Sequence, residues 1–290
     1  MTRTLRPYRI GLIGSGVGTS LSPALHEQEA RRLGLEYEYR TLDLDALGCA
    51  AADVPRLVTE ACRAGFTGLN ITHPGKQIVV EHLDELSPAA AALGAVNTVL
   101  FEGDRSVGHN TDSSGFAQSL TRGLPGARTR TVVLLGAGGA GTAVAHAVLG
   151  LGARTVTVVD VEPGRAVRLA AELVRAFGAG RAAPGRHDRL AEHLAAADGL
   201  IHATPTGMAA YPGLPLPADA LVPDLWVAEV VYRPLETELL RHARGAGCRT
   251  LDGGGMAVFQ AAHAFELFTG VRADPERMMR HFAGLVAADR

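Results

Sequence analysis

The stretch TVVLLGAGGAG (131–141) decides the fold of the C-terminal half of this chain. Its apolar start predicts a buried strand, and the alanine-rich segment that follows (142–151) predicts a helix. Between them, Gly136, Gly138 and Gly141 have the GxGxxG spacing. The first glycine permits a tight turn, the second lets the backbone approach a pyrophosphate, and the third lets the helix pack closely on the strand. Because a helix N-terminus attracts anions, this unit predicts dinucleotide binding, with a merely glycine-rich turn as the alternative.

The second strand of this unit indicates which dinucleotide is bound. The segment TVTVVD (155–160) ends at Asp160, about 20 residues after the glycine loop. A carboxylate there accepts hydrogen bonds from the adenosine ribose hydroxyls and repels a 2′-phosphate. The next residue, Val161, supplies no cation, and Arg165 lies one turn further, within reach of adenine or solvent. The sequence therefore predicts NAD rather than NADP, and the alternative role of Asp160 is that of a helix N-cap.

Predicted strands alternate with helices in two series, which indicates an α/β fold with two α/β lobes. The expected strands of the first series are 8–14, 37–44, 65–72 and 95–101, the last followed by a turn at 102–104; those of the second are 132–135, 155–160, 199–205, 226–232 and 248–253. Such alternation predicts parallel sheets with right-handed crossovers and a domain boundary near 108–115. A helix is expected to start near Ser22-Pro23 with Ser22 as its N-cap, and 178–190 reads as a loop.

Composition excludes several classes of function. The chain has 290 residues, 47% of them apolar, and 28 basic against 30 acidic residues give a net charge of −2. This balance argues against nucleic acid or a membrane surface as the main partner. The three cysteines, Cys49, Cys62 and Cys248, have no metal-site spacing, no apolar run reaches membrane-spanning length, and the N-terminus lacks a signal sequence. We expect a cytoplasmic protein without a metal site, since the histidines also lack ligand spacing.

A candidate proton carrier lies in GLNITHPGK (68–76). Lys76 follows the end of a predicted strand, and the segment 65–94 holds no other Lys or Arg, although the chain otherwise prefers arginine. Asp112 lies in GHNTD (108–112), near the predicted domain boundary. A nicotinamide cofactor carries hydride only, so the protein must move a proton, and a lysine beside an aspartate can do so. Burial lowers the pKa of a lysine and a carboxylate raises it, so the sequence leaves open which effect wins and whether the pair is only a salt bridge between lobes.

Nine segments in this order make the chain resemble the shikimate dehydrogenase family, including its NAD-dependent quinate/shikimate dehydrogenase branch. They are SLSPALH (20–26), GLNITHPGK (68–76), LDELSP (83–88), GAVNTV (94–99), GHNTD (108–112), GAGGAG (136–141), ATPTGM (203–208), VVYRPLET (230–237) and LDGGGMAVFQAAHAFELFTG (251–270).

The resemblance implies a substrate-binding domain (1–110) completed by C-terminal helices (255–290), and a Rossmann domain (111–254). It implies an oxidoreductase that reversibly oxidises the C3 hydroxyl of shikimate or quinate with NAD, with Lys76 and Asp112 as the catalytic pair. The implied substrate residues are Ser20, Ser22, Asn70, Thr72, Asn97, Tyr232 and Gln260. The implied cofactor residues are Gly136, Gly138, Gly139, Ala140, Gly141, Asp160, Arg165, Thr204, Pro205, Val231, Gly253 and Met256. The partner is then a small cyclic polyol acid, and the protein is a monomer or homodimer.

Some positions depart from the family pattern. Gly75 stands where the family usually has a larger residue, and it is expected to loosen the loop and leave space beside Lys76. Asp160-Val161-Glu162 replaces the usual Asn-Arg-Thr clamp for NADP, in agreement with NAD. His73 favours the quinate branch and Ser22 the shikimate pattern, so both acids remain candidates. The alternatives are a dehydrogenase of an amino-substituted analogue and a non-catalytic NAD-sensing relative.

Overall fold

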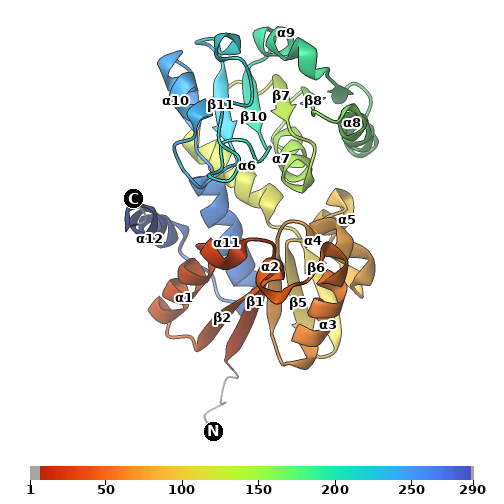
Figure 1. Ribbon diagram of the computed structural model, residues 1–290, viewed down its shortest axis with the longest axis vertical. Helices are drawn as coiled ribbons and strands as arrows, with labels where there is room; N and C mark the ends of the chain where they lie inside the picture. Colours follow the sequence, from red (N-terminus) through yellow and green to blue (C-terminus); the bar gives the residue numbers. More distant parts are fainter. Residues whose placement is uncertain (1–6, 289–290) are drawn as a thin grey trace. The chain divides into compact units, whose positions relative to one another are not determined.

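The computed structural model describes residues 7–288 and divides into two compact units (Figure 1). The first unit contains the residues up to Thr111 and those from Val258 onward, and the second runs from Asp112 to Ala257. Helix α11 (Gly254–Thr269) carries the chain from the second unit back into the first. The C-terminal residues therefore complete a unit that the N-terminal residues begin.

The first unit is built on a six-stranded sheet in the order β2-β1-β3-β5-β6-β4. The strands are β1 (Tyr8–Gly14), β2 (Tyr37–Asp43), β3 (Gly68–Ile71), β4 (Glu85–Leu86), β5 (Thr98–Glu102) and β6 (Arg105–His109). β1 pairs in parallel with β2 and β3, but β5 is antiparallel to both β3 and β6. The prediction of a purely parallel sheet is therefore wrong here. Glu102 pairs with Arg105, so only Gly103 and Asp104 connect β5 to β6, and such a short turn joins only antiparallel strands.

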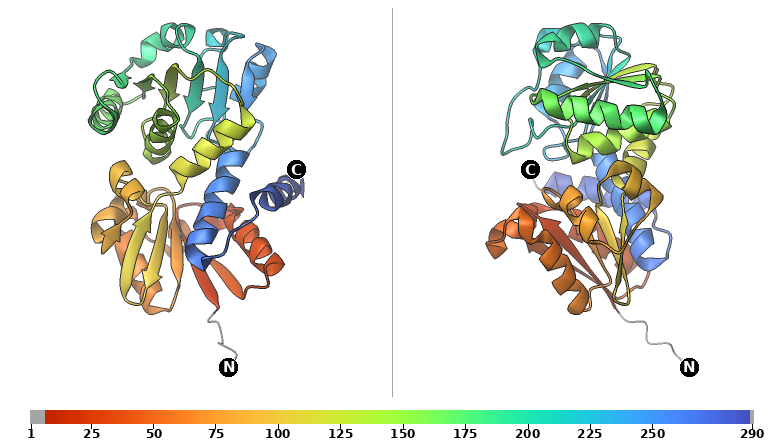
Figure 2. Two further views of the ribbon diagram at one scale, coloured as in Figure 1. Left: turned by 180° about the vertical axis from the view of Figure 1, so that it is seen from behind. Right: turned by 90° about the vertical axis from the view of Figure 1, so that its right-hand side faces the viewer.

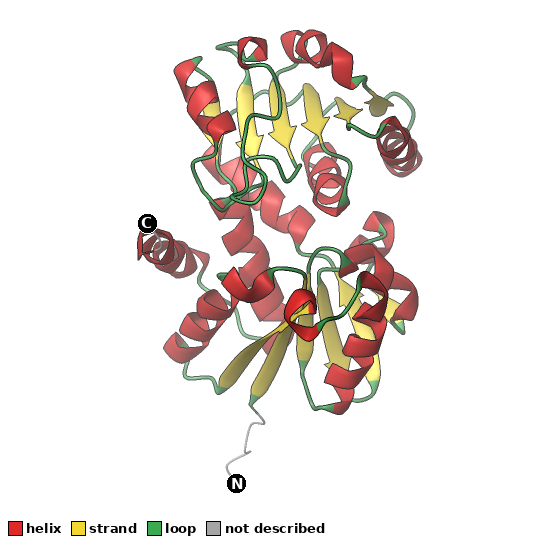
Figure 3. Ribbon diagram, viewed as in Figure 1, coloured by secondary structure: helices red, strands yellow, loops and turns green. Residues whose placement is uncertain are grey.

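Helices pack on both faces of this sheet (Figure 3). They are α1 (Ser22–Arg32), α2 (Leu44–Leu47), α3 (Val54–Arg63), α4 (Gly75–Ile78), α5 (Pro88–Leu93) and α12 (Pro275–Ala288), with α11 from the chain's return. One face buries Ile13 and Ile71 against the apolar stripe of α3, whose buried residues recur at helical spacing. The other face buries Ile10 and Leu12 against Phe268 of α11. Residues 10, 12 and 13 of one strand thus supply two cores, as alternation of side chains in a strand requires.

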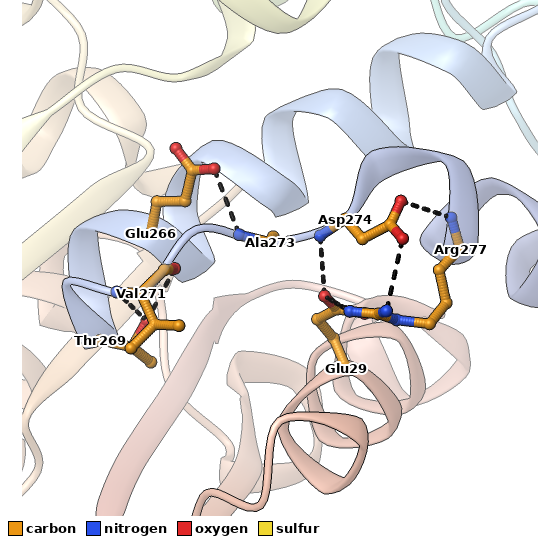
Figure 4. A network of polar contacts seen from close by, with 7 residues as sticks. All are labelled: Glu29, Glu266, Thr269, Val271, Ala273, Asp274 and Arg277. Atoms are coloured by element: carbon orange, nitrogen blue, oxygen red, sulfur yellow. Dashed lines mark hydrogen bonds and ion pairs between the residues drawn. The ribbon is translucent and has the colours of Figure 1, made fainter.

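A buried carboxylate holds the last helix, α12, against α1 (Figure 4). Glu29 is 1% exposed, and its two oxygens accept hydrogen bonds from Nε and Nη2 of Arg277 at 2.8 and 2.5 Å. It also accepts the backbone N–H of Asp274 at 2.8 Å, while the Asp274 carboxylate accepts the N–H of Arg277 at 3.0 Å. A two-pronged Arg–carboxylate contact fixes orientation as well as distance. The C-terminal helix is therefore a fixed part of the first unit.

The second unit has an all-parallel sheet in the order β12-β11-β10-β7-β8-β9. The strands are β7 (Thr131–Leu135), β8 (Thr155–Val159), β9 (Ala182–Pro184), β10 (Gly199–His202), β11 (Trp226–Glu229) and β12 (Arg249–Leu251); the helices are α6 (Asp112–Gly123), α7 (Gly139–Gly150), α8 (Pro163–Phe177), α9 (Leu190–Ala195) and α10 (Glu238–Gly245). Figure 2 shows this unit from two further sides. Val132 and Leu134 pack in one core with α6, α7 and α8, whereas Val133 and Leu135 pack with α9 and α10. A sheet covered on both faces explains why β7 is apolar from Val132 to Leu135.

The segment 178–190, predicted to be a loop, contains the short strand β9, so that prediction is wrong in part. β9 pairs only with β8, at the edge of the sheet. An edge strand can contain a proline, here Pro184, because one side of it needs no hydrogen bonds. None of the helices in residues 7–288 is long and apolar enough to cross a membrane.

Candidate functional site

The glycine loop after β7 has three glycines with different surroundings. Gly136 has φ of 107°, and a Cβ atom on it would lie 2.6 Å from the carbonyl oxygen of Ala203. A Cβ atom on Gly141 would lie 2.0 Å from the carbonyl oxygen of Gly136. By contrast, a Cβ atom on Gly138 would have no neighbour within 4 Å. Packing therefore requires the first and third glycines, while the second leaves its backbone open next to the N-terminus of α7, as a bound pyrophosphate needs.

Asp160 follows β8 and braces this loop. Its Oδ2 accepts the N–H of Ala137 at 2.8 Å, and its Oδ1 accepts the N–H of Glu162 at 2.9 Å. The N-cap residue of α8 is Glu162, so Asp160 caps the preceding turn and not the helix itself. Each carboxylate oxygen still has a second lone pair. The structural role is thus compatible with accepting a ribose hydroxyl, although the side chain is only 8% exposed.

The residues after Asp160 offer little to a 2′-phosphate. Val161 is 75% exposed and uncharged. Arg165 carries the only guanidinium between 160 and 165, and its Nη2 lies 2.8 Å from Oε1 of Glu162. A phosphate would have to compete with that carboxylate for the arginine. The local charge therefore favours a cofactor without the 2′-phosphate.

Two loops follow the neighbouring strands β10 and β11, and a buried pair of side chains connects them. Nδ1 of His202 lies 2.8 Å from Oε1 of Glu229, and Nε2 of His202 lies 2.5 Å from the hydroxyl of Thr204. The Glu229 carboxylate also accepts the N–H of Val231 at 3.0 Å and the hydroxyl of Thr237 at 3.0 Å. Both ionisable side chains are fully buried. No role was predicted for His202, although the sequence places a histidine and a glutamate at the ends of two apolar strands.

The remaining predicted cofactor residues have mixed surroundings. Gly139 and Ala140 form the first turn of α7. Gly253, which follows β12, packs against the loop after the neighbouring strand β11. A Cβ atom on Gly253 would lie 2.5 Å from the carbonyl oxygens of both Val230 and Val231. Met256 is 7% exposed and belongs to the apolar core beside α6 and α7. Pro205 is exposed in the loop after β10. The loops, rather than Met256, offer open surface.

In the first unit, Lys76 lies on a short helix directly after β3. Thr72 and a cis His73–Pro74 peptide connect β3 to α4, and Lys76 is the second residue of α4. The lysine is half-buried, and its carbonyl oxygen accepts the N–H of Val96 at 2.8 Å. It is the only lysine in the 290-residue sequence. Any chemistry that needs a primary side-chain amine must therefore use this residue.

Gly75, which precedes Lys76, does not create the expected space. A Cβ atom there would lie 2.9 Å from Cγ2 of Ile71 and 3.1 Å from Cγ1 of Val54. The residue is buried, and its N–H donates to the carbonyl of Thr72 at 2.8 Å. The expectation of a loosened loop is wrong, because the glycine lets α4 pack directly on β3 and α3.

A chain of buried amides and hydroxyls lies beside this helix. Asn70 Nδ2 donates to the carbonyl oxygen of Asn97 and to the hydroxyl of Thr98, both at 3.2 Å, and its Oδ1 accepts the hydroxyl of Tyr39 at 2.7 Å. Asn97 Oδ1 accepts the N–H of Thr111 at 2.9 Å, and its Nδ2 donates to the Thr111 hydroxyl at 2.9 Å. Asn70 and Asn97 are 7% and 3% exposed. Both amide hydrogens of Asn70 are used internally, so its observed contacts are structural.

Topology brings several predicted substrate residues to one edge of the first sheet. Thr72 and Lys76 follow the end of β3, and Asn97 precedes β5, which runs antiparallel to β3. β6 returns antiparallel to β5 and leads through His109 to Thr111. The backbone confirms the closeness: the N–H of Ile71 donates to Asn97, and the N–H of Asn97 donates to His109, at 2.9 and 3.0 Å.

Ser20 lies in the loop after β1, and Ser22 is the first residue of α1. The Asp43 carboxylate accepts the N–H groups of Gly16 and Gly18 at 3.1 and 3.0 Å, which fixes the loop. The Ser20 hydroxyl accepts the N–H of Ser22 at 3.2 Å. The N-cap residue of α1 is Leu21, so the prediction of Ser22 as N-cap is wrong. Both serines are partly exposed and so remain accessible to a ligand.

Other predicted residues lie apart from this edge in the chain. Asp112 is buried at the start of α6 in the second unit, and Tyr232 lies in that unit after β11. Gln260 is half-buried on α11 in the first unit. The Lys76–Asp112 pair joins residues of different units and stays a prediction. In the part of the chain that the structure describes, no group of three or more His, Cys, Asp or Glu side chains could hold a metal ion.

Three family descriptions match successive parts of the chain. Residues 12–99 match the shikimate dehydrogenase substrate binding domain, and 253–281 match the shikimate 5′-dehydrogenase C-terminal domain. Residues 108–218 match the C-terminal domain of alanine dehydrogenase/PNT. The first match lies within the first unit, and the second lies there from Val258 onward. The third match lies within the second unit from Asp112 onward and includes the glycine loop.

Similar proteins match along almost the whole chain. A protein of Streptomyces avermitilis named shikimate dehydrogenase (NADP(+)) is 65% identical, over 96% of each chain. A protein of Corynebacterium efficiens named quinate/shikimate dehydrogenase (NAD(+)) is 47% identical, over 95% of this chain and 98% of its own. The solved structure of quinate dehydrogenase from Corynebacterium glutamicum in complex with NAD matches with a TM-score of 0.90 and 44% identity, over 96% of this chain and 99% of its own.

Proposed function

The chain belongs to the shikimate dehydrogenase family, and on this premise we propose that it reversibly oxidises the C3 hydroxyl of shikimate or quinate to the ketone, with NAD as cofactor. The observation that carries the proposal is the position of Lys76, the only lysine of the chain, at the sheet edge shared with Thr72 and Asn97. A half-buried amine beside hydroxyl-binding groups can accept the proton of an alcohol.

The chemistry divides between cofactor and protein. A dinucleotide held by the glycine loop and Asp160 would supply the acceptor for the hydride of the carbinol carbon. Lys76 accepts the hydroxyl proton, and in the reverse direction it returns the proton to the ketone oxygen. Asp112 orients the lysine and the substrate, and Ser20 and Ser22 bind the substrate carboxylate. Thr72, Asn97 and Gln260 read the ring hydroxyls, because amides and hydroxyls both donate and accept hydrogen bonds.

The preference for NAD rests on the chain's own residues, since the relatives' names divide between the two cofactors. Asp160 is acidic, Val161 is uncharged, and Arg165 is already paired with Glu162. We expect kcat/KM with NAD to exceed that with NADP by at least ~30-fold, which corresponds to about 2 kcal/mol. The paired substitution Asp160→Ala with Val161→Arg is expected to shift the preference toward NADP. Equal use of both cofactors by the unaltered enzyme contradicts this part of the proposal.

We propose further that both acids are substrates. They share the carboxylate and the ring hydroxyls, and quinate adds one hydroxyl at C1. The small side chain of Ser22 leaves room there and offers that hydroxyl a partner; an unpaired hydroxyl would cost about 1–3 kcal/mol. A ratio of kcat/KM beyond about 10³ in favour of shikimate exceeds that cost and contradicts dual use. Ser22→Thr is expected to change this ratio more than it changes NAD affinity.

The deciding experiment is a steady-state comparison of both acids with both cofactors, followed by absorbance of the reduced nicotinamide. Turnover of either acid supports the proposal. Turnover only of an amino-substituted analogue favours a dehydrogenase of secondary metabolism. Binding of NADH without turnover of any of these compounds favours a sensing role, in which Lys76 would have no proton to move.

A further inference from the structure

Two ionisable side chains are buried in the second unit without a role in the proposed chemistry. His202 and Glu229 are the last residues of β10 and β11, which are paired side by side with Cα partners at these two positions. The other residues of both strands are apolar or glycine. Burying such groups is costly unless their hydrogen bonds are satisfied, and replacing a buried pair by apolar residues often costs no stability. The presence of this pair is therefore explained better by a role beyond stability.

The hydrogen bonds of the pair run to two different loops. The Glu229 carboxyl group has three partners: it accepts the N–H of Val231 and the hydroxyl of Thr237, and its Oε1 is hydrogen-bonded to Nδ1 of His202. On the other side, Nε2 of His202 meets the hydroxyl of Thr204, which also accepts the N–H of Thr206 at 3.2 Å. The imidazole is therefore a bridge from the loop after β10 to the loop after β11.

Sheet topology indicates which part of a dinucleotide these loops face. The chain passes from β7 to β8 on one side and later returns to β10 on the other side of β7. Dinucleotides bind across such a reversal, outside the carboxyl ends of the strands. The glycine loop after β7 faces the pyrophosphate, and Asp160 after β8 faces the adenosine half. The loops after β10 and β11 therefore face the nicotinamide half.

We propose that His202 and Glu229 are positioning residues that fix these two loops against the nicotinamide half of the cofactor. Glu229 sets the backbone at Val231, and His202 orients the hydroxyl of Thr204. The inference rests on the proposed function for the identity of the cofactor, but it concerns binding and not turnover. Neither side chain needs to touch the cofactor, because both are fully buried and act through the loop residues that they hold.

Two substitutions of His202 cut the bridge at different ends. The polar atoms of an asparagine reach about as far as Nδ1, so His202→Asn keeps the contact with Glu229 and loses the one with Thr204. A glutamine reaches about as far as Nε2, so His202→Gln keeps the contact with Thr204 and loses the one with Glu229. The matched control is Ile201→Val, because Ile201 is the fully buried neighbour on the same strand and makes no side-chain hydrogen bond. The control reports the effect of a small loss of packing alone.

The readout separates the two halves of the cofactor. Binding of NADH and NADPH is measured by fluorescence, and binding of ADP-ribose, which lacks nicotinamide, is measured by calorimetry on the same proteins. We expect both His202 variants to weaken binding of the preferred reduced dinucleotide by about tenfold and to change ADP-ribose binding by less than about twofold. This tenfold loss lies within the range for an ordinary intramolecular hydrogen bond. Ile201→Val is expected to change neither.

Several outcomes overturn the inference. Equal losses for NADH and ADP-ribose mean that the pair only supports the fold of the unit. Unchanged NADH binding in His202→Gln means that the link to Glu229 plays no part. If neither His202 variant folds, Glu229→Gln is measured instead. The amide oxygen of glutamine can still accept the N–H of Val231, but an NH2 group replaces the second carboxyl oxygen. NADH binding that survives this substitution overturns the proposal. Because all of these measurements are made without substrate, failure to oxidise shikimate or quinate leaves the result intact.

Discussion

The two units present their candidate ligand groups in different ways. At the glycine loop of the second unit, the candidate groups for a pyrophosphate are backbone N–H groups at Gly138 and the start of α7. At the corresponding edge of the first unit, the groups are side chains: the amine of Lys76, the amide of Asn97 and the hydroxyl of Thr72. A pyrophosphate is the same in every dinucleotide, so backbone groups can bind it. A ring polyol is recognised by the positions of its hydroxyls, which only side chains can match.

The supports of these groups differ as well. In the first unit, neutral amides and hydroxyls brace one another from Asn70 through Asn97 to Thr111. In the second, carboxyl groups brace the loops, with Asp160 holding the glycine loop and Glu229 holding the loop after β11. Substitutions in the first unit should therefore affect substrate and chemistry, and substitutions in the second should affect cofactor binding.

Lys76→Ala is expected to lower kcat by ~10² or more, the range for a lost acid–base group, and to leave the dissociation constant of NADH unchanged. Lys76→Arg is the matched variant, because arginine keeps the charge but does not give up its proton. If Lys76 only forms a salt bridge, the arginine variant retains activity. Loss of NADH binding with kcat retained at saturating cofactor would show that Lys76 contributes to cofactor binding and not to proton transfer.

Gly138→Ala and Gly141→Ala are expected to separate binding from folding in the second unit. The new methyl at 138 meets no protein atom, so the melting temperature should be unchanged while the dissociation constant for NADH rises by about tenfold, equivalent to about 1.4 kcal/mol. The new methyl at 141 would lie 2.0 Å from a backbone oxygen, so that variant should lose folded protein. Thermal melts and NADH fluorescence measure the two effects. Unchanged NADH affinity in Gly138→Ala would mean that the pyrophosphate does not approach this glycine.

Asn97→Ala tests the side-chain network of the first unit. The Thr111 N–H and hydroxyl would lose their partner in a buried place, which costs about 1–3 kcal/mol of unfolding free energy. We expect a raised KM for the polyol acid and an unchanged KM for the cofactor. Urea unfolding and steady-state kinetics provide the measurements. A cofactor KM that rises as much as the substrate KM would contradict the claim that substitutions in the first unit affect the substrate alone.

His26 is expected to give the first unit an acid sensitivity. Burial lowers the pKa of His26 to about 3 from its ordinary 6.5, and its Nδ1 lies 2.8 Å from the Tyr37 hydroxyl. Between these two values the unfolded chain binds a proton that the folded chain excludes, so stability falls as the pH drops below 6.5. The loss approaches about 1.4 kcal/mol per pH unit. Urea unfolding at pH 7.5 and 5.5 should show a smaller difference for His26→Gln than for the unaltered protein; equal differences would contradict this assignment.

Local patterns in the sequence were enough to predict many elements. The apolar run before the glycines predicted β7, and YRIGLIG predicted β1 with the bounds that the structure shows. Both patterns depend on neighbours along the chain, where periodicity and turn residues act directly. By contrast, β6 and β9 were not predicted. Each is short and lies among polar residues, and its strand conformation depends on a partner strand: β5 for β6, and β8 for β9.

The residues of the candidate site also differ in whether the sequence alone or only the folded structure reveals their role. The glycine spacing and the lone lysine were visible in the sequence because each residue type carries its own chemistry. The role of Gly75 was misread, because whether a glycine leaves space or fills it depends on Ile71 and Val54, which only folding brings near. His202 was overlooked for a similar reason, since Glu229 and Thr204 reach its two nitrogens only when β10 and β11 lie side by side.

The sequence by itself thus determined the family, the α/β alternation, the dinucleotide loop and the acidic residue after β8. These are properties of single segments, in which residue type and spacing decide backbone conformation and charge. Only the tertiary structure decided the mixed pairing of the first sheet, the bracing of Asp160 against the glycine loop, and the buried bridge between the loops after β10 and β11. Each of these depends on atoms that are distant in the chain, and hydrogen bonds and close packing act only over a few ångströms.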